Sequence, residues 1–384
     1  SMSSDGTKLV VGGPTYGALT ADKGHVRVFQ FIRGDVDSNW LQLGNDLYGD
    51  VENGEFGTSV SLSADGSTVA IGTPLVSPRV SVYRLNPKKR SWVRMGDDLT
   101  HVGSDDGPSE FGASVSLSAN GKQLLVGAPL KGYVQVYTLS YNDKQQWIAG
   151  IRTNATTTSD NTILDQECVS GFGRLISMNA NGTRFASFVP RASCEKGSIT
   201  IFDRFLSNHI DNPVVTFQPV FDIPAHDVYK RGRGSFALSL DGDKIAVSSP
   251  GSGVEVYCQN GTTPSSWRLL GPLITLEERD GVVMSLAIAR NRIVVALERT
   301  VIKLLEITKN EKEWSAIAKD IDSPYGHFGY SISLSSDATF LAAGAPTADV
   351  NLDNRNEGLV QTFELRGVNT TRWDGLMFLN WFGL

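Results

Sequence analysis

The sequence is poor in the residue patterns that mark the commonest metal, nucleophile and nucleotide sites. Its 384 residues include only three cysteines and five histidines, and no His-Glu-x-x-His pair for zinc occurs. Gly-x-Ser-x-Gly turns and Gly-rich phosphate loops ending in lysine are absent too. These absences exclude the motifs of zinc proteases, α/β-hydrolases and P-loop enzymes.

Strong charge and long apolar runs are also missing. The formal net charge is −6, so a nucleic-acid partner would receive no electrostatic support. No apolar run approaches the roughly 20 residues of a membrane span, and we expect none in this part of the chain. The opening Ser-Met pair is not a natural start, so we expect a fragment of a longer chain.

What the chain does contain is a repeat. Phe-Gly begins four copies, at Phe56, Phe111, Phe172 and Phe328, and weaker copies begin near Gly234 and Gly281. An apolar strand ending in Gly-x-Pro recurs up to Pro14, Pro74, Pro129 and Pro346. Decayed versions of this strand end at Pro190, Pro250 and Glu298. Together these segments give seven copies.

Each copy continues with a third alternating strand, such as "HVRVFQF" or "YVQVYTL", and most copies have a Trp that opens a fourth strand. The Trp residues are Trp40, Trp92, Trp147, Trp267, Trp314 and Trp373. Seven copies of four antiparallel strands predict an all-β, seven-bladed β-propeller that forms a single domain over residues 3–384. The predicted blades are roughly 3–50, 51–104, 105–166, 167–229, 230–278, 279–322 and 323–384.

The chemistry of the repeat agrees with this count. Alternation with period two gives each strand two faces to bury, which one blade cannot do alone. The repeated Phe and Trp are interpreted as packing between blades, and the Gly beside each Phe as a position of close backbone approach. Asp-Gly or Asn-Gly joins the first two strands in five copies, which predicts type I′ turns there. Asn291-Arg292 and Asp337-Ala338 depart from this pattern.

The first copy lacks its first strand, so we expect an irregular first blade. The chain starts at "SSDGTKLVVGGP", directly at the hairpin turn. The tail Gly375–Leu384 is a candidate donor, although Trp373 already marks the fourth strand of the last blade. Either the tail is that fourth strand and the ring closes imperfectly, or the first strand is missing from this chain.

The repeat unit resembles the FG-GAP family, especially its short form in bacterial and algal surface proteins. "FGTSVSLSADGSTVAIGTP" and "FGASVSLSANGKQLLVGAP" carry the resemblance, which extends over nearly the whole chain. The same pattern occurs in the integrin α-subunit head, a seven-bladed propeller that binds protein ligands. The resemblance implies an extracellular or cell-surface recognition module, but not a particular ligand.

Integrin-type repeats often hold calcium between their first two strands, where this chain has only "SADGS" or "SANGK". Those connections are too short to surround a cation with six or seven oxygens. One other segment, "ADVNLDNRNEG", spaces oxygen donors two or four residues apart, at Asp349, Asn351, Asp353 and Glu357. It is a candidate calcium site or an ordinary polar loop, and the sequence indicates no other cofactor.

Long, variable connections are expected on one face of the propeller, where a ligand would bind. The candidate ligand-contacting residues in these loops are Asp97, Asp98, Asp105, Asp106, Glu110, Lys230, Arg231 and Arg233. The acidic members could attract cations or a basic partner, or could be solvated loop surface. His226 and His327 lie in connections on the same face.

Cys168 and Cys194 are expected in loops at the same end of one blade. A disulfide between them would close a loop of about 26 residues and stabilise the fold by roughly 3 kcal/mol. Such a bridge would fit an oxidising compartment, whereas three free thiols would favour the cytosol. Cys258 is expected to be a buried thiol.

The first functional hypothesis is a non-catalytic, monomeric recognition or adhesion module that binds a protein or glycan through the variable loop face. It places the protein outside the cell or on its surface. The alternatives are a propeller hydrolase or lyase with a site at the channel mouth, and an intracellular scaffold.

Overall fold

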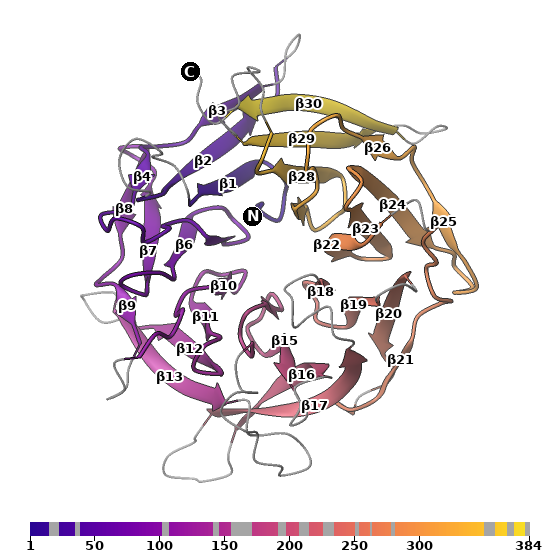
Figure 1. The fold of residues 1–384 in the computed structure, drawn as a ribbon, viewed down its shortest axis with the longest axis horizontal. Helices are drawn as coiled ribbons and strands as arrows, with labels where there is room; N and C mark the ends of the chain where they lie inside the picture. The colour runs from indigo at the N-terminus through magenta and orange to yellow at the C-terminus, as the bar shows by residue number, and fades with distance from the viewer. Residues whose placement is uncertain are drawn as a thin grey trace. The chain divides into compact units, whose positions relative to one another are not determined.

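In a computed structural model the chain forms seven small antiparallel sheets and is a seven-bladed β-propeller (Figure 1). The structure describes residues 1–14, 23–34, 39–101, 107–140, 146–154, 171–190, 197–206, 215–225, 234–249, 253–261, 263–277, 281–348, 358–366 and 372–380. Within these ranges no helix is found, and so none that is long and apolar enough to cross a membrane. The predicted fold class is confirmed.

The first four sheets are formed as follows. Blade 1 contains β1 (Lys8–Gly13), β2 (His25–Ile32), β3 (Asn39–Gln42) and β4 (Leu47–Tyr48). Blade 2 contains β5 (Ser59–Leu62), β6 (Thr68–Thr73), β7 (Arg79–Asn86), β8 (Ser91–Arg94) and β9 (Leu99–Thr100). Blade 3 contains β10 (Ser114–Leu117), β11 (Gln123–Ala128), β12 (Tyr133–Leu139) and β13 (Trp147–Asn154). Blade 4 contains β14 (Ile176–Met178), β15 (Arg184–Pro190), β16 (Gly197–Leu206) and β17 (Val215–Ala225).

Three more sheets complete the fold. Blade 5 contains β18 (Phe236–Leu238), β19 (Lys244–Ser249), β20 (Gly253–Gln259) and β21 (Trp267–Leu269). Blade 6 contains β22 (Val283–Ala289), β23 (Arg292–Leu297), β24 (Val301–Ile307), β25 (Trp314–Ala316) and β26 (Ile321–Asp322). Blade 7 contains β27 (Ser331–Leu334), β28 (Phe340–Ala345), β29 (Leu359–Arg366) and β30 (Arg372–Asn380).

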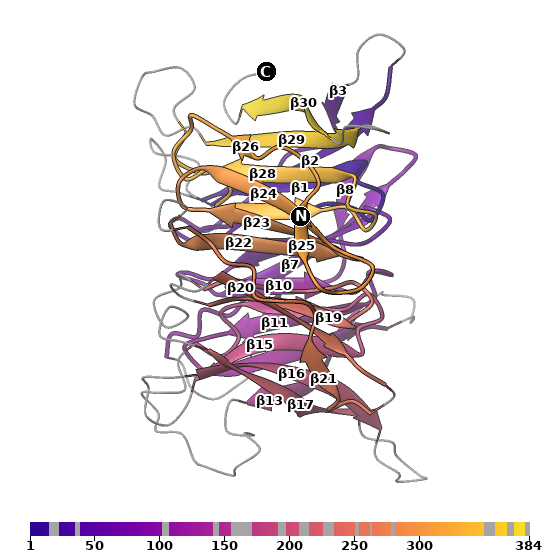
Figure 2. The ribbon, with the colours of Figure 1, turned by 90° about the vertical axis from the view of Figure 1, so that its right-hand side faces the viewer.

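Neighbouring strands in each sheet follow chain order, so every blade is a meander from its first to its fourth strand. The short strands β4, β9 and β26 pair with the third strand of their blade, beyond the end of the fourth. Figure 2 shows β28, β29 and β30 of blade 7 stacked in this order. All six predicted Trp residues lie in fourth strands.

The chain contacts divide the molecule into two compact units. Unit 1 comprises Ser1, Lys8–Gln30 and Leu41–Ala225, and unit 2 comprises Met2–Thr7, Phe31–Trp40 and His226–Leu384. Unit 1 holds blades 2, 3 and 4 with most of blade 1, and unit 2 holds blades 5, 6 and 7.

The repeated Phe residues pack between blades, as the sequence predicts. In unit 1, Phe111 is fully buried and shares a cluster with Val80 and Leu99 of blade 2 and with Leu124 and Tyr137 of its own blade. Phe56, Phe172 and Phe328 are 2% exposed or less and occupy the corresponding clusters. Each blade therefore contributes apolar side chains that only a neighbouring blade can cover.

The glycines of the two motifs meet at the blade interfaces of unit 1. A Cβ atom at Gly72 would lie 2.0 Å from the carbonyl oxygen of Gly112 in the next blade, and one at Gly127 would lie 1.9 Å from that of Gly173. No real Cβ atom tolerates such distances, so both Gly-x-Pro positions require glycine. The pairing of Phe-Gly with Gly-x-Pro thus has a steric cause.

The first residues of the chain take the place of the first strand that the sequence lacks. Ser1 and Val10 of β1 exchange two backbone hydrogen bonds of 2.9 and 3.0 Å, as first and second strands do elsewhere. The Ser1 hydroxyl also accepts a hydrogen bond from the Leu62 amide, just as Ser61 accepts one from Leu117. Ser1 therefore pairs with β1 where the other blades have their first strand.

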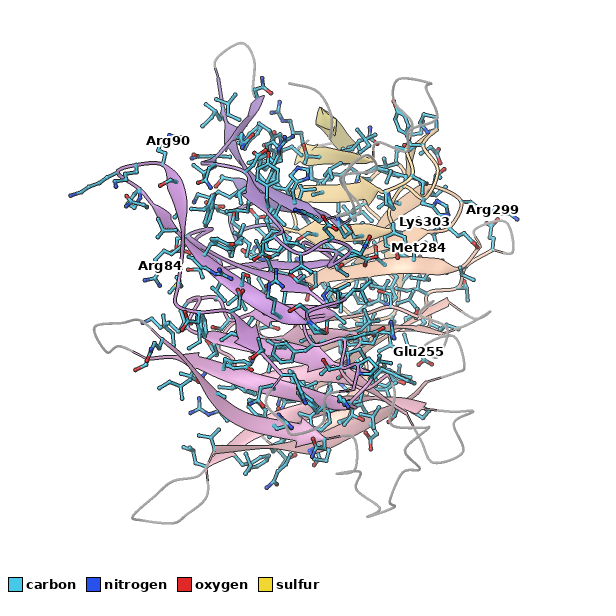
Figure 3. The ribbon with its side chains drawn as sticks, turned by 60° about the vertical axis from the view of Figure 1, so that its left-hand side comes forward. Arg84, Arg90, Glu255, Met284, Arg299 and Lys303 are labelled. Atoms are coloured by element: carbon cyan, nitrogen blue, oxygen red, sulfur yellow. The ribbon has the colours of Figure 1, made fainter. Side chains whose placement is uncertain are left out.

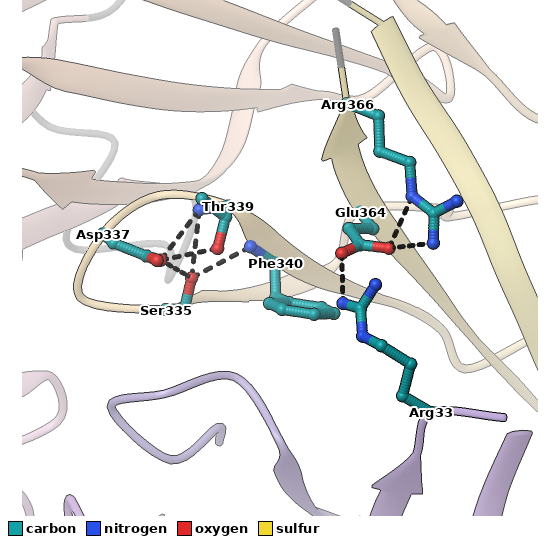
Figure 4. Close-up of polar contacts among 7 residues, drawn as sticks. All are labelled: Arg33, Ser335, Asp337, Thr339, Phe340, Glu364 and Arg366. Carbon is teal, nitrogen blue, oxygen red and sulfur yellow. Dashed lines mark hydrogen bonds and ion pairs between the residues drawn. The ribbon is translucent and has the colours of Figure 1, made fainter. Parts of the chain in front are cut away.

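The tail, by contrast, is the fourth strand of blade 7, since β30 pairs with β29 from Leu359↔Asn380 to Arg366↔Arg372. In unit 2 the Arg33 guanidinium donates a 2.5 Å hydrogen bond to the Glu364 carboxylate, which also accepts hydrogen bonds from Arg366 (Figure 4). Burial alone would raise the pKa of Glu364, but the two arginines more than offset it and lower the pKa. This carboxylate ties the segment after β2 to β29.

The turns between first and second strands differ from the prediction. Gly6 and Gly66 have positive φ angles of 73° and 66°, but the aspartates before them are not among the residues with positive φ. The Gly66 amide instead donates to the Ser63 carbonyl at 2.8 Å, and the Asp65 carboxylate accepts hydrogen bonds from Ser63 and Ser67. The expectation of type I′ turns is wrong, because the Asp side chain stabilises a turn with one left-handed residue. Figure 4 shows the same Asp-centred turn at Asp337.

His25 at the start of β2 makes the free energy of unfolding depend on pH. Its ring is fully buried and stacks on Tyr48 at 5.8 Å. Burial lowers the pKa of His25 to about 4, with the Arg27 charge adding to the effect and Asp46 opposing it. Between pH 6.5 and 4 the unfolded chain binds the proton more tightly, so the free energy of unfolding falls as the pH falls.

We expect His25→Gln to remove this part of the acid sensitivity. The change in unfolding free energy between pH 7 and 4 should be up to about 3 kcal/mol smaller in the variant than in the wild type. Urea unfolding at both pH values measures the difference. Equal pH dependence of the two proteins would show that His25 is not the group responsible.

Candidate functional site

Two sets of connections form one face of blades 2 to 4: those that contain the Phe-Gly pairs, before the first strands, and those between second and third strands. We call it the Phe-Gly face. It comprises residues 54–58, 109–113 and 171–175 before the first strands, and 74–78 and 129–132 between second and third strands. The loop 74–78 starts and ends beside Gly112, because Gly72 and the Arg79 carbonyl both touch that glycine. Gly127 and the Tyr133 carbonyl place the loop 129–132 beside Gly173 in the same way.

The residue before each Phe has an unusual backbone conformation. Glu55 and Glu110 have φ angles of 57° and 49°, in the left-handed region that residues with a side chain rarely occupy. In unit 2, His327 has a φ of 56° at the same repeat position. In blade 4 the position is held by glycine, Gly171. Ionisable residues thus occupy a position for which glycine is the better backbone choice.

The charged groups of this face come from three consecutive blades. Glu110 of blade 3 forms a 3.1 Å ion pair with Arg174 of blade 4, whose side chain remains 46% exposed. The Glu55 carboxylate of blade 2 lies 3.5 Å from the Thr58 hydroxyl, which donates a stronger hydrogen bond of 2.8 Å to the Glu55 carbonyl. The Phe-Gly face of unit 1 therefore has two partly exposed carboxylates and one partly exposed guanidinium. These three groups, of Glu55, Glu110 and Arg174, are called the charged rim.

Of the predicted ligand-contacting residues, Glu110 belongs to this rim, whereas Asp98 binds residues of its own blade. The Asp98 carboxylate pairs with Arg79 and Arg94 and accepts a hydrogen bond from Ser81. Asp97 is exposed next to it. The negative charge of Asp98 is therefore largely compensated within the blade.

Ser81 occupies a polar position that recurs on the third strand of every blade, near the start of that strand. Its members are Arg27, Ser81, Gln135, Thr200, Glu255, Lys303 and Gln361. Several bind a carboxylate near the fourth strand, as Arg27 does with Asp46 and Lys303 with Asp320. Figure 3 labels Glu255 and Lys303. Sequence reasoning missed this position, although its polar residue within an apolar alternation was a signal.

The remaining predicted site residues lie outside the described residues. These are the loop residues Asp105, Asp106, Lys230, Arg231 and Arg233, the calcium candidates Asp349, Asn351, Asp353 and Glu357, and the cysteines Cys168 and Cys194. Among the described residues no group of three or more His, Cys, Asp or Glu could hold a metal ion. Cys258 is buried with a free thiol. The calcium site and the disulfide stay predictions.

Two of the described histidines form hydrogen bonds with hydroxyl groups. His101 Nδ1 lies 2.5 Å from the Tyr133 hydroxyl, and the Arg152 guanidinium stacks over the Tyr133 ring at 4.1 Å. Burial raises the pKa of Tyr133 to about 12, so this phenol remains protonated near neutral pH. In unit 2, His327 Nδ1 lies 2.7 Å from the Thr347 hydroxyl, while His226 is outside the described residues.

Comparison with solved structures matches the whole fold. A protein of Bacteroides uniformis described as a candidate 6-phosphogluconolactonase has a TM-score of 0.64 at 12% identity, and the match covers 97% of this chain and 96% of that one. A periplasmic gluconolactonase of Pseudomonas aeruginosa has a TM-score of 0.60 at 14% identity, with the same coverage. A protein of Lactobacillus plantarum has a TM-score of 0.57 at 10% identity, covering 97% and 95% of the two chains.

No family model matches the sequence, and no curated protein does. The FG-GAP resemblance therefore gains support for its propeller fold but not for the family itself. At identities of 10 to 14% the structural matches show the fold alone.

The expectation of a non-catalytic recognition or adhesion module is contradicted by these comparisons. Two of the propellers that match over nearly the full chain are described as lactonases, which are enzymes. The physical reason for the error is that a repeat motif reports how blades pack, and packing does not depend on what the loops do.

Proposed function

We propose that the protein is a hydrolase that opens a lactone ring at the Phe-Gly face of blades 2 to 4. The observation that carries the proposal is the match of 97% of the chain to two propellers described as lactonases. The charged rim of Glu55, Glu110 and Arg174 supports it, because ester hydrolysis needs a base for water and a cation for the oxyanion.

In this proposal the Glu55 carboxylate accepts a proton from a water molecule whose oxygen attacks the lactone carbonyl carbon. Negative charge then develops on the carbonyl oxygen, where the Arg174 guanidinium stabilises it. The ring C–O bond breaks as the carbonyl re-forms, and the leaving alkoxide takes the proton from Glu55. The product is an open-chain hydroxy acid, and no oxidant or reductant is needed.

Glu110 is the positioning residue for Arg174. Its carboxylate holds the Arg174 guanidinium of the next blade at 3.1 Å. A guanidinium held by one carboxylate retains N–H groups for a second acceptor.

We also propose that the repeat is related to the FG-GAP family. The support is the contact between the motif glycines, since Gly72 and Gly127 each lie against the Phe-Gly glycine of the next blade. A family profile built from close homologues of this chain tests the relation: recovery of known FG-GAP sequences supports it, and recovery of lactonase sequences alone contradicts it.

Acid release from uncharged δ-lactones, followed at constant pH by titration with base, tests the activity. We expect a saturable rate above that of buffer, and Arg174→Gln should lower kcat by about 100-fold. Arg204→Gln, a change on β16 outside this face, is the matched control and should leave the rate unchanged. A wild-type rate equal to that of buffer with every lactone contradicts the proposal.

A further inference from the structure

Exposed apolar side chains accompany the charged rim of the Phe-Gly face. Leu75 is 36% exposed, Val76 70% and Leu130 41%. They lie in the loops 74–78 and 129–132, between the second and third strands of two consecutive blades. Large apolar side chains gathered beside polar groups are a common feature of ligand sites.

The backbone places these side chains next to the charged groups. The Leu75 amide donates a 3.4 Å hydrogen bond to the Gly54 carbonyl, directly before Glu55. The same loop lies beside Gly112, two residues after Glu110. The backbone of this loop thus lies close to the backbone of Glu55 and of Glu110.

Leu130 occupies the corresponding place beside the cation. The Pro129 carbonyl accepts a hydrogen bond from the Gly171 amide, and Ala128 and Tyr133, on either side of the loop 129–132, lie against Gly173, the residue before Arg174. The loop 74–78 therefore lies beside the backbone of the two glutamates, and the loop 129–132, which also carries Lys131, lies beside that of Arg174.

The charges of this face are of both signs. Glu55 and Glu110 repel a phosphate dianion, whereas Arg174, which has a carboxylate partner, and Lys131 of the loop 129–132 attract it. An apolar substituent on the lactone, in contrast, would remove water from Leu75, Val76 and Leu130.

Building on the proposed function, we infer that the substrate is a lactone with an apolar substituent. The lactone carbonyl lies at Arg174, and the substituent lies on the loops 74–78 and 129–132.

Four probes test the inference by their kcat/KM values: δ-valerolactone, δ-decalactone with its pentyl substituent, glucono-δ-lactone and its 6-phosphate. We expect δ-decalactone to exceed δ-valerolactone by at least about tenfold, because a pentyl group gains more from apolar contacts than a single methylene does. Glucono-δ-lactone and its 6-phosphate, which lack an apolar substituent, should each fall at least about tenfold below δ-decalactone.

The double variant Val76→Ser, Leu130→Ser should lower kcat/KM for δ-decalactone about tenfold and leave δ-valerolactone within about twofold. Leu206→Ser is the control, because Leu206 is 61% exposed at the far end of β16. Thermal unfolding confirms that each variant is folded.

The outcomes separate the two proposals. Hydrolysis that favours glucono-δ-lactone or its 6-phosphate over δ-decalactone overturns the inference and leaves the proposed function standing. An equal loss for δ-decalactone and δ-valerolactone in the double variant does the same. No hydrolysis of any of the four probes overturns both.

Discussion

Gly127→Ala is expected to lower the free energy of unfolding by about 3 kcal/mol or more. A Cβ atom at this position would lie 1.9 Å from the Gly173 carbonyl oxygen, which is backbone of the next blade and cannot rotate away. Relief requires blades 3 and 4 to separate locally, and this would loosen the cluster around Phe172 and Leu125.

Urea unfolding of the wild type and the variant measures this loss. Gly150→Ala is the matched control, because its Cβ atom would have its nearest contact at 3.4 Å, with the Val136 carbonyl oxygen. That control should change the stability by less than about 1 kcal/mol. Equal stabilities for Gly127→Ala and the control would show that the motif glycines do not set the blade spacing.

Glu55→Gln is expected to lower kcat for lactone hydrolysis by about 100- to 10,000-fold, with little change in stability. The amide has nearly the same shape as the carboxylate but cannot accept the proton of the attacking water. The residual rate would come from Arg174 and from substrate binding.

Glu52→Gln is the control for this loss, because Glu52 is exposed in the same connection and has no proposed role. Its kcat should stay within about twofold of that of the wild type. If Glu55→Gln retained full activity, another base would be required and the mechanism proposed here would be wrong.

The sequence was sufficient to predict the fold because the residues that stack the blades recur in most of the repeats. Phe111 and Gly127 meet the same kinds of neighbour as their counterparts in other copies, and this recurrence is visible in the sequence as a motif. The pairing of Ser1 with Val10 of β1 was not predicted, because so short a segment has no recognisable alternation.

The candidate site was harder to predict, because its residues are adjacent only across blades. Glu110 and Arg174 are 64 residues apart, and nothing in the sequence pairs them. The ion pairs of Asp98 with Arg79 and Arg94, on β7 and β8, could not be predicted from the sequence either. The left-handed backbone at Glu55 could not be predicted from the sequence either, because such a position normally carries glycine.

The most direct test of the site asks where a substrate analogue binds. Methyl spectra of the protein labelled at Leu and Val would be titrated with an alkyl-substituted δ-lactam, whose amide resists hydrolysis. The account predicts saturable shifts at Leu75, Val76 and Leu130 and none at Leu206 or Leu269, both of which are well exposed. Shifts at Leu206 or Leu269 alone, or no shifts at high concentrations of the lactam, would contradict it.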